Sequence, residues 1–256
     1  MDSEDQEVLQ YADNLYLSAM TVMAVAEPKI QGKWNRDPKI IGLTILGRSL
    51  SIFKAALLLA RANQVLEARM LARPMYENLL WIAALRERGA SFVEEMVEDD
   101  ALNRKSLGQT TMKLTAQHGS DPNAAGGLIL REIIRALAKT YEDPKKLHAD
   151  KVAAMGKVEL LYVDYTRLSF DSLHCSVTAL GHHISSERVS DLETIVTVAV
   201  EPKFGKDEMA RTVRHLCRAL MGVAITANEL LGFTSASANL TAAVHEFETR
   251  GWTSAE

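Results

Sequence analysis

Apolar residues recur at the spacing of an α-helix along most of this chain, and that pattern restricts the fold more than any other feature. In the first such segment the apolar residues that share one helical face are Val8, Tyr11, Leu15, Ala19, Val22 and Met23. The low number of prolines, six, and the many Ala, Leu and Met residues also favour helices. We therefore expect an all-α fold.

Capping residues and chain breakers delimit the predicted helices. Pro38 suits the first position of the second helix, and Gly89 suits the end of the third. Ser91 and Glu94 form a capping-box pattern at the start of the fourth. The predicted helices cover residues 3–27, 38–61, 63–88, 91–117, 121–141, 156–181, 207–231 and 238–250.

Residues 182–205 depart from this pattern. They contain ETIVTVAV, a β-branched run bounded by polar turns, which is typical of a short strand or hairpin. We therefore predict a multi-helix bundle of about seven to nine helices with a small irregular or β-hairpin insertion near 182–205. The sequence has no internal repeat and no convincing linker, so we expect one helical domain over 1–256, in which 1–36 form an N-terminal helical extension.

Charge and cysteine content restrict the class of protein. The net charge of −4 and the pI near 6.0 argue against a broad DNA- or RNA-binding surface, although a local basic patch is compatible with them. Cys175 and Cys217 lie far apart, which disfavours a disulfide framework and suits a reducing cytoplasm. The acidic N-terminus does not resemble a signal peptide, and apolar runs such as AALLLA are shorter than the ~20 residues that span a bilayer. We expect a cytoplasmic protein without a membrane partner.

Arg73 and Glu77 are the first candidate site residues. They lie four positions apart on the predicted helix 63–88 and therefore face the same way, on a stripe that is otherwise partly apolar. Charge in such a place is costly unless it is matched, which predicts a partly buried ion pair. Pro74 beside it removes one backbone donor and favours a kink. The pair either marks a functional cleft or fixes the packing of the bundle.

The segment YTRLSFDSLHCS, residues 165–176, carries the second group of candidates. At 100° per residue, one face of the predicted helix 156–181 presents an acid, a base, an acid and an imidazole in turn. These four residues are Asp164, Arg167, Asp171 and His174. The opposite, apolar face is formed by Val158, Leu161, Tyr162, Tyr165 and Leu168, and it continues into Ser169 and Ser172.

The polar face has the groups that a metal-independent ribonuclease uses. Asp171 lies between Arg167 and His174 and can reach either. A carboxylate bonded to an imidazole fixes its tautomer and favours a general base, and a nearby guanidinium binds phosphate or stabilises an oxyanion. The alternative is a solvated face on which i,i+3 and i,i+4 ion pairs stabilise the helix.

Other polar groups support weaker hypotheses. His182 and His183 follow Gly181 at a predicted helix end, where imidazoles can satisfy free carbonyls. A basic patch shares one face of the predicted helix 207–231 and could dock RNA or another anion. Its residues are Arg211, Arg214, His215 and Arg218. The sequence contains no E-x-x-H pair, no glycine-rich phosphate loop and no G-x-S-x-G elbow, so we expect neither a metal nor a cofactor.

Two motifs resemble those of a bacterial all-helical family of unknown function. ARPMYENLLW contains an R-x-x-x-E motif, and YTRLSFDSLHCS resembles Y-x-x-L-S followed by a His, a small residue and a Ser. The family usually has Pro directly after the His, where this chain has Cys175. More distantly, Arg167 and His174 resemble the R-x4-6-H signature of HEPN domains, helical bundles that often dimerise and cut RNA without metal. That resemblance implies a homodimer in which both residues face their symmetry mates across a cleft.

Two functional hypotheses follow. The first is a HEPN-like ribonuclease of toxin or phage-defence type that binds RNA. In it His174 is the general base or acid, Arg167 binds phosphate, and Asp171 or Ser169 tunes them. The second is a non-catalytic ligand-binding or scaffold protein with a structural polar network. That network consists of Arg73, Glu77, Tyr165, Ser169 and His174.

Overall fold

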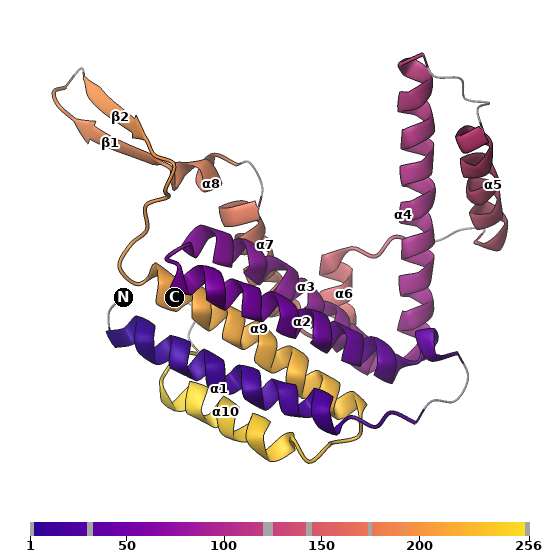
Figure 1. The fold of residues 1–256 in the computed structure, drawn as a ribbon, viewed down its shortest axis with the longest axis horizontal. Helices are drawn as coiled ribbons and strands as arrows, with labels where there is room; N and C mark the ends of the chain where they lie inside the picture. Colours follow the sequence, from indigo (N-terminus) through magenta and orange to yellow (C-terminus); the bar gives the residue numbers. More distant parts are fainter. Residues whose placement is uncertain are drawn as a thin grey trace.

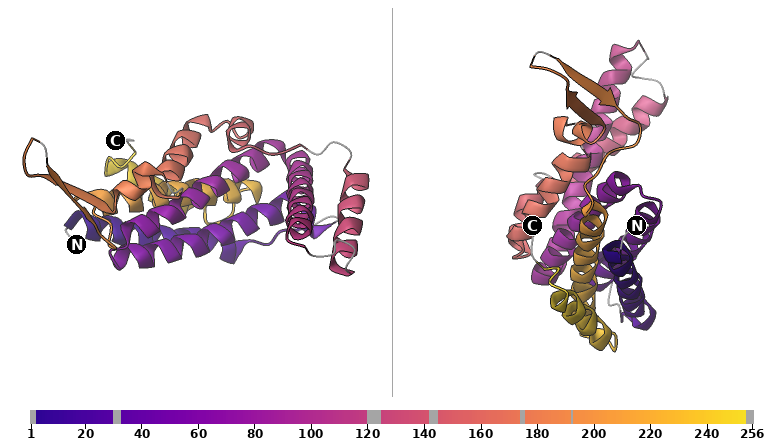
Figure 2. Two further views of the ribbon diagram at one scale, coloured as in Figure 1. Left: turned by 90° about the horizontal axis from the view of Figure 1, so that it is seen from above. Right: turned by 90° about the vertical axis from the view of Figure 1, so that its left-hand side faces the viewer.

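The computed structural model describes residues 3–29, 33–119, 125–141, 145–173, 176–191 and 193–253. Long helices pack side by side into a bundle, from which a helical hairpin and a β-hairpin project at opposite ends (Figures 1 and 2). In chain order the elements are α1 (Ser3–Val25), the 3-10 turn η1 (Trp34–Arg36), α2 (Pro38–Arg61), α3 (Val65–Arg88), α4 (Ala90–Gln117), α5 (Ala125–Thr140), α6 (Ala149–Met155), α7 (Glu159–Leu168), the π-helical turn η2 (Ser169–Leu173), α8 (Val177–Gly181), β1 (Ile184–Arg188), β2 (Thr194–Val198), α9 (Glu208–Leu230) and α10 (Ser237–Thr249).

Local sequence signals predict most of these elements correctly. Helix α2 has the predicted bounds, because Pro38 occupies its first position and the Asp37 side chain accepts a hydrogen bond from the backbone N–H of Lys39 at 2.8 Å. The expected hairpin is present as β1 and β2, which pair antiparallel with Ile184 opposite Val198. The prediction of an all-α bundle with a small β-hairpin insertion is confirmed.

Helices α2, α3 and α9 form the centre of the bundle, and α1 packs against α2 and α9. Helix α10 covers α1 and α9, and the buried hydroxyl of Tyr11 in α1 donates a hydrogen bond to the carbonyl of Ala243 in α10 at 2.9 Å. Of the described helices, α2 alone has the length and apolar composition of a membrane span. Its buried residues, however, pack against α1, α3 and α9 as those of a core helix do.

The predicted continuous helix 156–181 is wrong. The chain instead forms α7, the π-helical turn η2 and the short α8. Helix α6 ends just before Gly156, so this glycine separates a short helix from α7, as a glycine near the start of the predicted helix suggests. A Cβ atom at Gly156 would lie 2.8 Å from the Cβ of Ala83 and 2.9 Å from the backbone nitrogen of Ala84. Glycine is therefore required where the turn between α6 and α7 passes over α3.

The capping box predicted at Ser91 is also wrong. Helix α4 begins at Ala90, directly after Gly89, whose φ of +56° breaks the chain away from α3. The hydroxyl of Ser91 donates to the carbonyl of Arg88 at 2.9 Å, and Glu94 pairs with Arg36 at 2.6 Å. Both side chains thus contact groups outside α4 rather than each other's backbone, because the N-cap is Gly89, two residues before the Ser91 that the pattern suggests.

Candidate functional site

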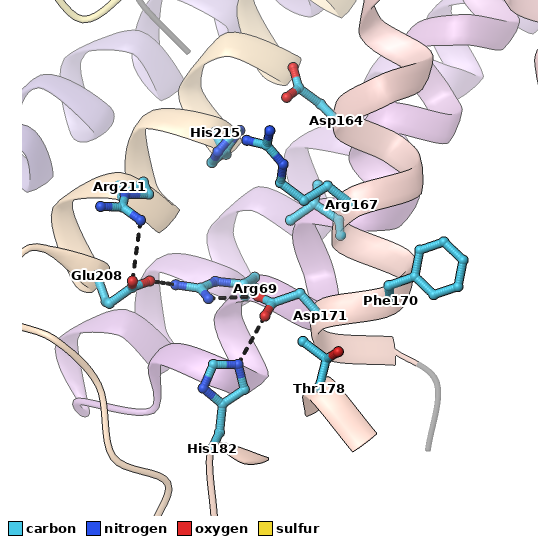
Figure 3. Close-up of a pocket in the computed structure, with 11 residues that line it drawn as sticks. Arg69, Asp164, Arg167, Phe170, Asp171, Thr178, His182, Glu208, Arg211 and His215 are labelled. Atoms are coloured by element: carbon cyan, nitrogen blue, oxygen red, sulfur yellow. Dashed lines mark hydrogen bonds and ion pairs between the residues drawn. The ribbon is translucent and has the colours of Figure 1, made fainter. Parts of the chain in front are cut away.

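A pocket of about 380 Å³ opens where α7 and η2 meet α3, α8 and the start of α9 (Figure 3). Most of the side chains that line it are charged or polar. The residues that line it are Arg69, Asp164, Arg167, Leu168, Phe170, Asp171, Thr178, His182, Glu208, Arg211 and His215. Arg167 and Asp171 were predicted as site residues, and the pocket brings them into one place.

Arg69 lies at the centre of the pocket and joins three elements. Its guanidinium donates to the carboxylate of Asp171 in η2 at 2.7 Å and to the carboxylate of Glu208 in α9. It also donates to the hydroxyl of Thr212 at 3.2 Å and lies 5.6 Å from the centre of the Phe204 ring. The Arg69 side chain is only 9% exposed, so its charge is stabilised by these partners rather than by water.

The carboxylate of Asp171 also contacts the imidazole of His182. Its Oδ1 lies 3.0 Å from Nε2 of His182, while Oδ2 accepts from Arg69. Burial acts to raise the pKa of the Asp171 carboxyl, but the hydrogen bonds from Arg69 and His182 outweigh it and lower that pKa. An ionised Asp171 can accept a proton carried on Nε2, and a neutral imidazole in that tautomer has its lone pair on Nδ1, as a general base requires.

The π-helical turn places Asp171 in this position. The hydroxyls of Ser169 and Ser172 donate to the carbonyls of Tyr165 and Leu168, four residues earlier, at 2.9 and 2.8 Å. The wider π turn changes the angle per residue, so Asp171 no longer follows the 100° rotation assumed for a regular helix. As a result its two oxygens contact Arg69 and His182, whereas a regular helix would have placed it within reach of either Arg167 or His174.

The face of α7 that carries Asp164 is not a fully solvated row of ion pairs. Asp164 is buried and lies 3.6 Å from Nη1 of Arg218, whose long side chain extends to it from α9. Arg167, by contrast, is exposed, and no described carboxylate lies within ion-pair distance of it. Figure 3 shows its side chain extending from α7 toward His215. Among the described residues, the guanidinium of Arg167 thus has no carboxylate partner in the pocket.

His215 forms the inner wall of the pocket. Its Nδ1 lies 3.1 Å from the hydroxyl of the buried Tyr76 in α3. Burial lowers the pKa of His215 to about 4, and the charges of Arg218 and Arg69 act in the same direction against the opposing charge of Asp164. The imidazole is therefore neutral at physiological pH.

The predicted basic patch does not act as one surface. Arg211 lines the pocket and pairs with Glu208 at 3.3 Å, whereas Arg214 pairs with Glu4 of α1 at 3.0 Å. Arg218 approaches Asp164 and also donates to the carbonyl of Trp252 near the C-terminus at 3.2 Å. Each cation is directed to a different neighbour because α9 is surrounded by other helices.

Arg73 and Glu77 form the expected ion pair, with 2.7 Å between Nη1 and Oε2. Arg73 also donates to the hydroxyl of Tyr165, and its guanidinium lies 4.7 Å from the centre of that ring. Burial, opposed by the charge of Arg73, raises the pKa of Tyr165. This network connects α3 to α7 and none of its three residues lines the pocket.

Two further residues, Ser169 and His174, were predicted as site residues. Ser169 is buried, and its hydroxyl donates a hydrogen bond within the helix and does not line the pocket. His174 lies outside the described residues, so its predicted role remains a prediction. In the part of the chain that the structure describes, no three His, Cys, Asp or Glu side chains are grouped so that they could hold a metal ion.

Two central residues, Arg69 and Glu208, were not predicted as site residues. Arg69 precedes Arg73 by one turn on a largely buried stripe of α3, and no acidic residue lies three or four positions from it. A charge on a buried stripe without a partner on its own helix is a signal that could have identified Arg69 as a site residue. Glu208 lies in the first turn of α9, where an acid is common in any helix, so its sequence context carries no such signal. His182 was considered only as a helix-end residue.

Residues 39–191 match the DUF5677 family, a family of unknown function, and the chain therefore belongs to this family. The matched stretch includes Arg69, Arg167, Asp171 and His182, and it ends before α9. No curated protein and no solved structure matches the chain.

Proposed function

We propose that this pocket is the active site of a metal-independent, HEPN-like ribonuclease. One observation carries the proposal: His182, oriented by the Asp171 carboxylate at 3.0 Å, and the unneutralised guanidinium of Arg167 line the same pocket. RNA needs little else for cleavage, because its own 2′-hydroxyl is the nucleophile and the protein supplies proton transfer and charge stabilisation.

The residues are assigned roles by their contacts. His182 Nδ1 accepts the proton of the 2′-hydroxyl, and the resulting imidazolium is stabilised by Asp171. The 2′-oxygen attacks phosphorus, the bond to the 5′-oxygen breaks, and the products are a 2′,3′-cyclic phosphate and a 5′-hydroxyl end. Arg167 and Arg211 bind the phosphate oxygens as negative charge develops on them.

The 5′-oxygen leaves with a proton from a general acid, and we propose His174 for this role, as the motif R-x6-H suggests. Arg69 is a positioning residue, because its side chain is 9% exposed and its guanidinium is bonded to Asp171 and Glu208. Ser169 positions Asp171 through the π turn. A toxin or phage-defence role in the cytoplasm, acting on cellular RNA, is part of the same proposal.

The test measures cleavage of a fluorescent RNA in EDTA by the full-length protein and by single variants. We expect His182→Ala to lower the rate by about 10²–10⁴-fold. Arg167→Ala should lower it as well, and the melting temperature of both variants should stay close to that of the parent. The matched controls are His183→Ala, whose Nδ1 bonds to the carbonyl of Ala199, and Arg188→Ala, an exposed arginine on β1.

Undiminished cleavage by both His182→Ala and Arg167→Ala would refute the assignment. His174→Ala belongs in the same series: if it alone abolishes cleavage, His174 is the base and His182 is a bystander. Loss of cleavage only in the presence of EDTA would contradict the metal-independent mechanism.

A non-catalytic ligand-binding or scaffold protein is the second candidate, and the Arg73–Glu77–Tyr165 network favours it. That network ties α3 to α7 and lies outside the pocket. This candidate predicts that the parent protein cleaves no RNA, and that Arg73→Ala lowers the melting temperature more than His182→Ala does, since it leaves Glu77 without its cation.

A further inference from the structure

The helical hairpin of α4 and α5 carries a charge opposite to that of the protein as a whole. Residues 101–140 contain six Lys and Arg residues but only two Asp and Glu residues, whereas the whole chain has a net charge of −4. The hairpin projects from the bundle, and α5 packs against no described element except α4 (Figures 1 and 2). Positive charge is therefore concentrated on a part of the molecule that is open to a partner.

The contact between the two helices shows where their other side chains lie. A Cβ atom at Gly108 of α4 would lie 3.0 Å from the side chain of Ile134 and 3.2 Å from that of Leu130, both in α5. Gly108, Leu130 and Ile134 thus mark the inner sides of the hairpin. Rotation by 100° per residue from these inner sides assigns the remaining side chains to one face of the hairpin or the other.

The two faces of the hairpin differ in chemistry. Helices α4 and α5 run antiparallel, so side chains rotated in the same sense from the inner side lie on the same face (Figure 1). Four cations are rotated by about 60–140° in one sense and form the basic face: Lys105, Lys113, Arg131 and Arg135. Four exposed apolar residues are rotated by about 80–120° in the opposite sense and form the apolar face: Leu107, Leu114, Ile129 and Ile133.

The cations of the basic face are short of carboxylate partners. Lys113 and Arg135 are exposed, and no described carboxylate lies within ion-pair distance of Lys105, Lys113 or Arg135. Most described arginines outside the hairpin, by contrast, pair with an acid, as Arg36 does with Glu94 at 2.6 Å. A solvated helix surface is commonly stabilised by pairs of opposite charge. A surface of like charges without such pairs favours a polyanion as its ligand.

We infer that the basic face of the α4–α5 hairpin binds the phosphate backbone of RNA. Lysine and arginine are the side chains that neutralise backbone phosphates, and they do so without reading the base sequence. An anionic lipid surface fits less well, because the exposed leucines and isoleucines that would enter it lie on the face opposite to the cations. RNA is also the substrate class of the proposed function, and the inference rests on that function in its choice of ligand.

The hairpin and the pocket lie at opposite ends of the bundle. Thr178 and His182 line the pocket next to the β-hairpin, and the α4–α5 hairpin projects from the other end (Figure 1). An RNA that contacts both must run along the bundle. The basic face therefore contributes to the affinity for long RNA and not to the chemical step in the pocket.

Binding of a long 2′-O-methyl oligoribonucleotide, measured by fluorescence anisotropy at several salt concentrations, tests the basic face. This probe lacks the 2′-hydroxyl nucleophile, so it stays intact whether or not the protein is a ribonuclease. Lys113→Gln combined with Arg135→Gln should raise the dissociation constant about tenfold at roughly 0.15 M salt. The slope of log K against log salt should also become shallower by about 1.4, because each lost contact to a single strand removes about 0.7.

The matched control replaces one lysine and one arginine that lie outside the basic face. Lys54 is exposed on α2, and Arg104 is 70% exposed on α4 but pairs with Asp100 at 2.8 Å. Lys54→Gln combined with Arg104→Gln makes the same change in net charge and should leave the dissociation constant close to that of the parent. Lys113→Arg combined with Arg135→Lys keeps both charges and should bind the probe as the parent does, which separates loss of charge from loss of structure.

Equal effects of the two glutamine double variants would overturn the inference, and so would a parent protein that does not bind the probe. If the Lys113→Gln and Arg135→Gln variant lost binding to phosphatidylglycerol vesicles but kept its affinity for the probe, a lipid surface would replace RNA as the partner. The ribonuclease proposal is judged separately. Hairpin-dependent binding without cleavage would reject the catalytic assignment alone, and cleavage without hairpin-dependent binding would reject the basic face alone.

Discussion

At the scale of single residues, Arg69 determines the geometry of the pocket. Its guanidinium bonds to Asp171 and Glu208 while its side chain is 9% exposed. Asp171 in turn orients His182, so a buried cation on α3 fixes the position of the proposed general base. A buried charge with several hydrogen bonds specifies one arrangement of its partners, because any other arrangement leaves a charge unmatched.

Replacing this cation should destabilise the fold. Arg69→Met removes the charge and leaves two carboxylates without their partner, so we expect the free energy of unfolding in urea to fall by about 3 kcal/mol. The matched control is Arg211→Met, which also loses a bond to Glu208 but at a side chain that is 45% exposed, and which should cost about 1 kcal/mol or less. Equal losses in the two variants would show that Arg69 does not hold the network.

His215 makes stability depend on pH. Its pKa is about 4 in the folded protein and 6.5 ordinarily, so between these values the unfolded chain binds more protons than the folded one. The stabilisation from a neutral His215 is therefore fully present above pH 6.5 and is lost as the pH falls toward 4. The pKa of Asp171 is lowered in the folded protein, so protonation of this carboxylate also decreases stability, but only below its ordinary pKa of 3.8.

We expect the free energy of unfolding to decrease by on the order of 3 kcal/mol from this histidine between pH 6.5 and 4. His215→Gln keeps a polar partner for Tyr76 and should flatten the dependence over that range. His245→Gln, at an exposed position, should leave it unchanged. A pH profile of His215→Gln that is superimposable on that of the parent would rule out the buried neutral imidazole as its cause.

At the scale of elements, two local departures from regular helix place the site. The turn at Gly156 brings the chain against α3 before α7 begins, and the π turn η2 then rotates Asp171 toward Arg69. If the chain were regular α-helix at Gly156 and through η2, each residue would be rotated by a constant angle about the helix axis, and the carboxylate of Asp171 would point in another direction. π turns within helices are often found at functional sites, which agrees with this placement.

The substitution Gly156→Ala tests whether the close approach of the turn at Gly156 to α3 matters for stability. Gly156→Ala would put a Cβ within 2.9 Å of the Ala84 backbone nitrogen, and because backbone cannot move aside easily we expect a loss of about 1–3 kcal/mol in thermal or urea unfolding. Gly181→Ala, at a helical position with nothing within 4 Å, should be neutral or slightly stabilising. If the two substitutions had the same effect, the close approach to α3 would not matter for stability.

At the scale of the whole molecule, the pocket lies in the bundle, from which two hairpins project. The pocket draws on α3, the α7–η2 segment, the loop at His182 and α9, so four parts of the chain must be packed before it exists. Residues 39–191 supply Arg69, Arg167 and His182, while Glu208 and His215 come from α9 beyond the family match. The β-hairpin begins directly after this site, and the two segments that flank it are joined where the carbonyl of His182 accepts a hydrogen bond from Lys203 N–H at 2.8 Å.

The sequence by itself determined the helices, the hairpin and several of the polar candidates. Apolar periodicity, Pro38 and the β-branched run 194–198 are local signals, and each acts on its own segment whatever the rest of the chain does. The i,i+4 pair of Arg73 and Glu77 was predictable for the same reason, because helix geometry alone brings the two side chains together.

Tertiary structure alone decided which polar residues meet. The Arg69–Asp171 contact joins residues 102 positions apart, and Arg69–Glu208 joins residues 139 apart, so no periodicity within one helix contains them. The π turn breaks the regular rotation on which the predicted Asp171 contacts depended, and Arg218 of α9 pairs with Asp164 on the face of α7 that the pattern presented as solvated. Local spacing specifies which face a residue occupies, whereas the identity of its partner depends on how the other helices pack against that face.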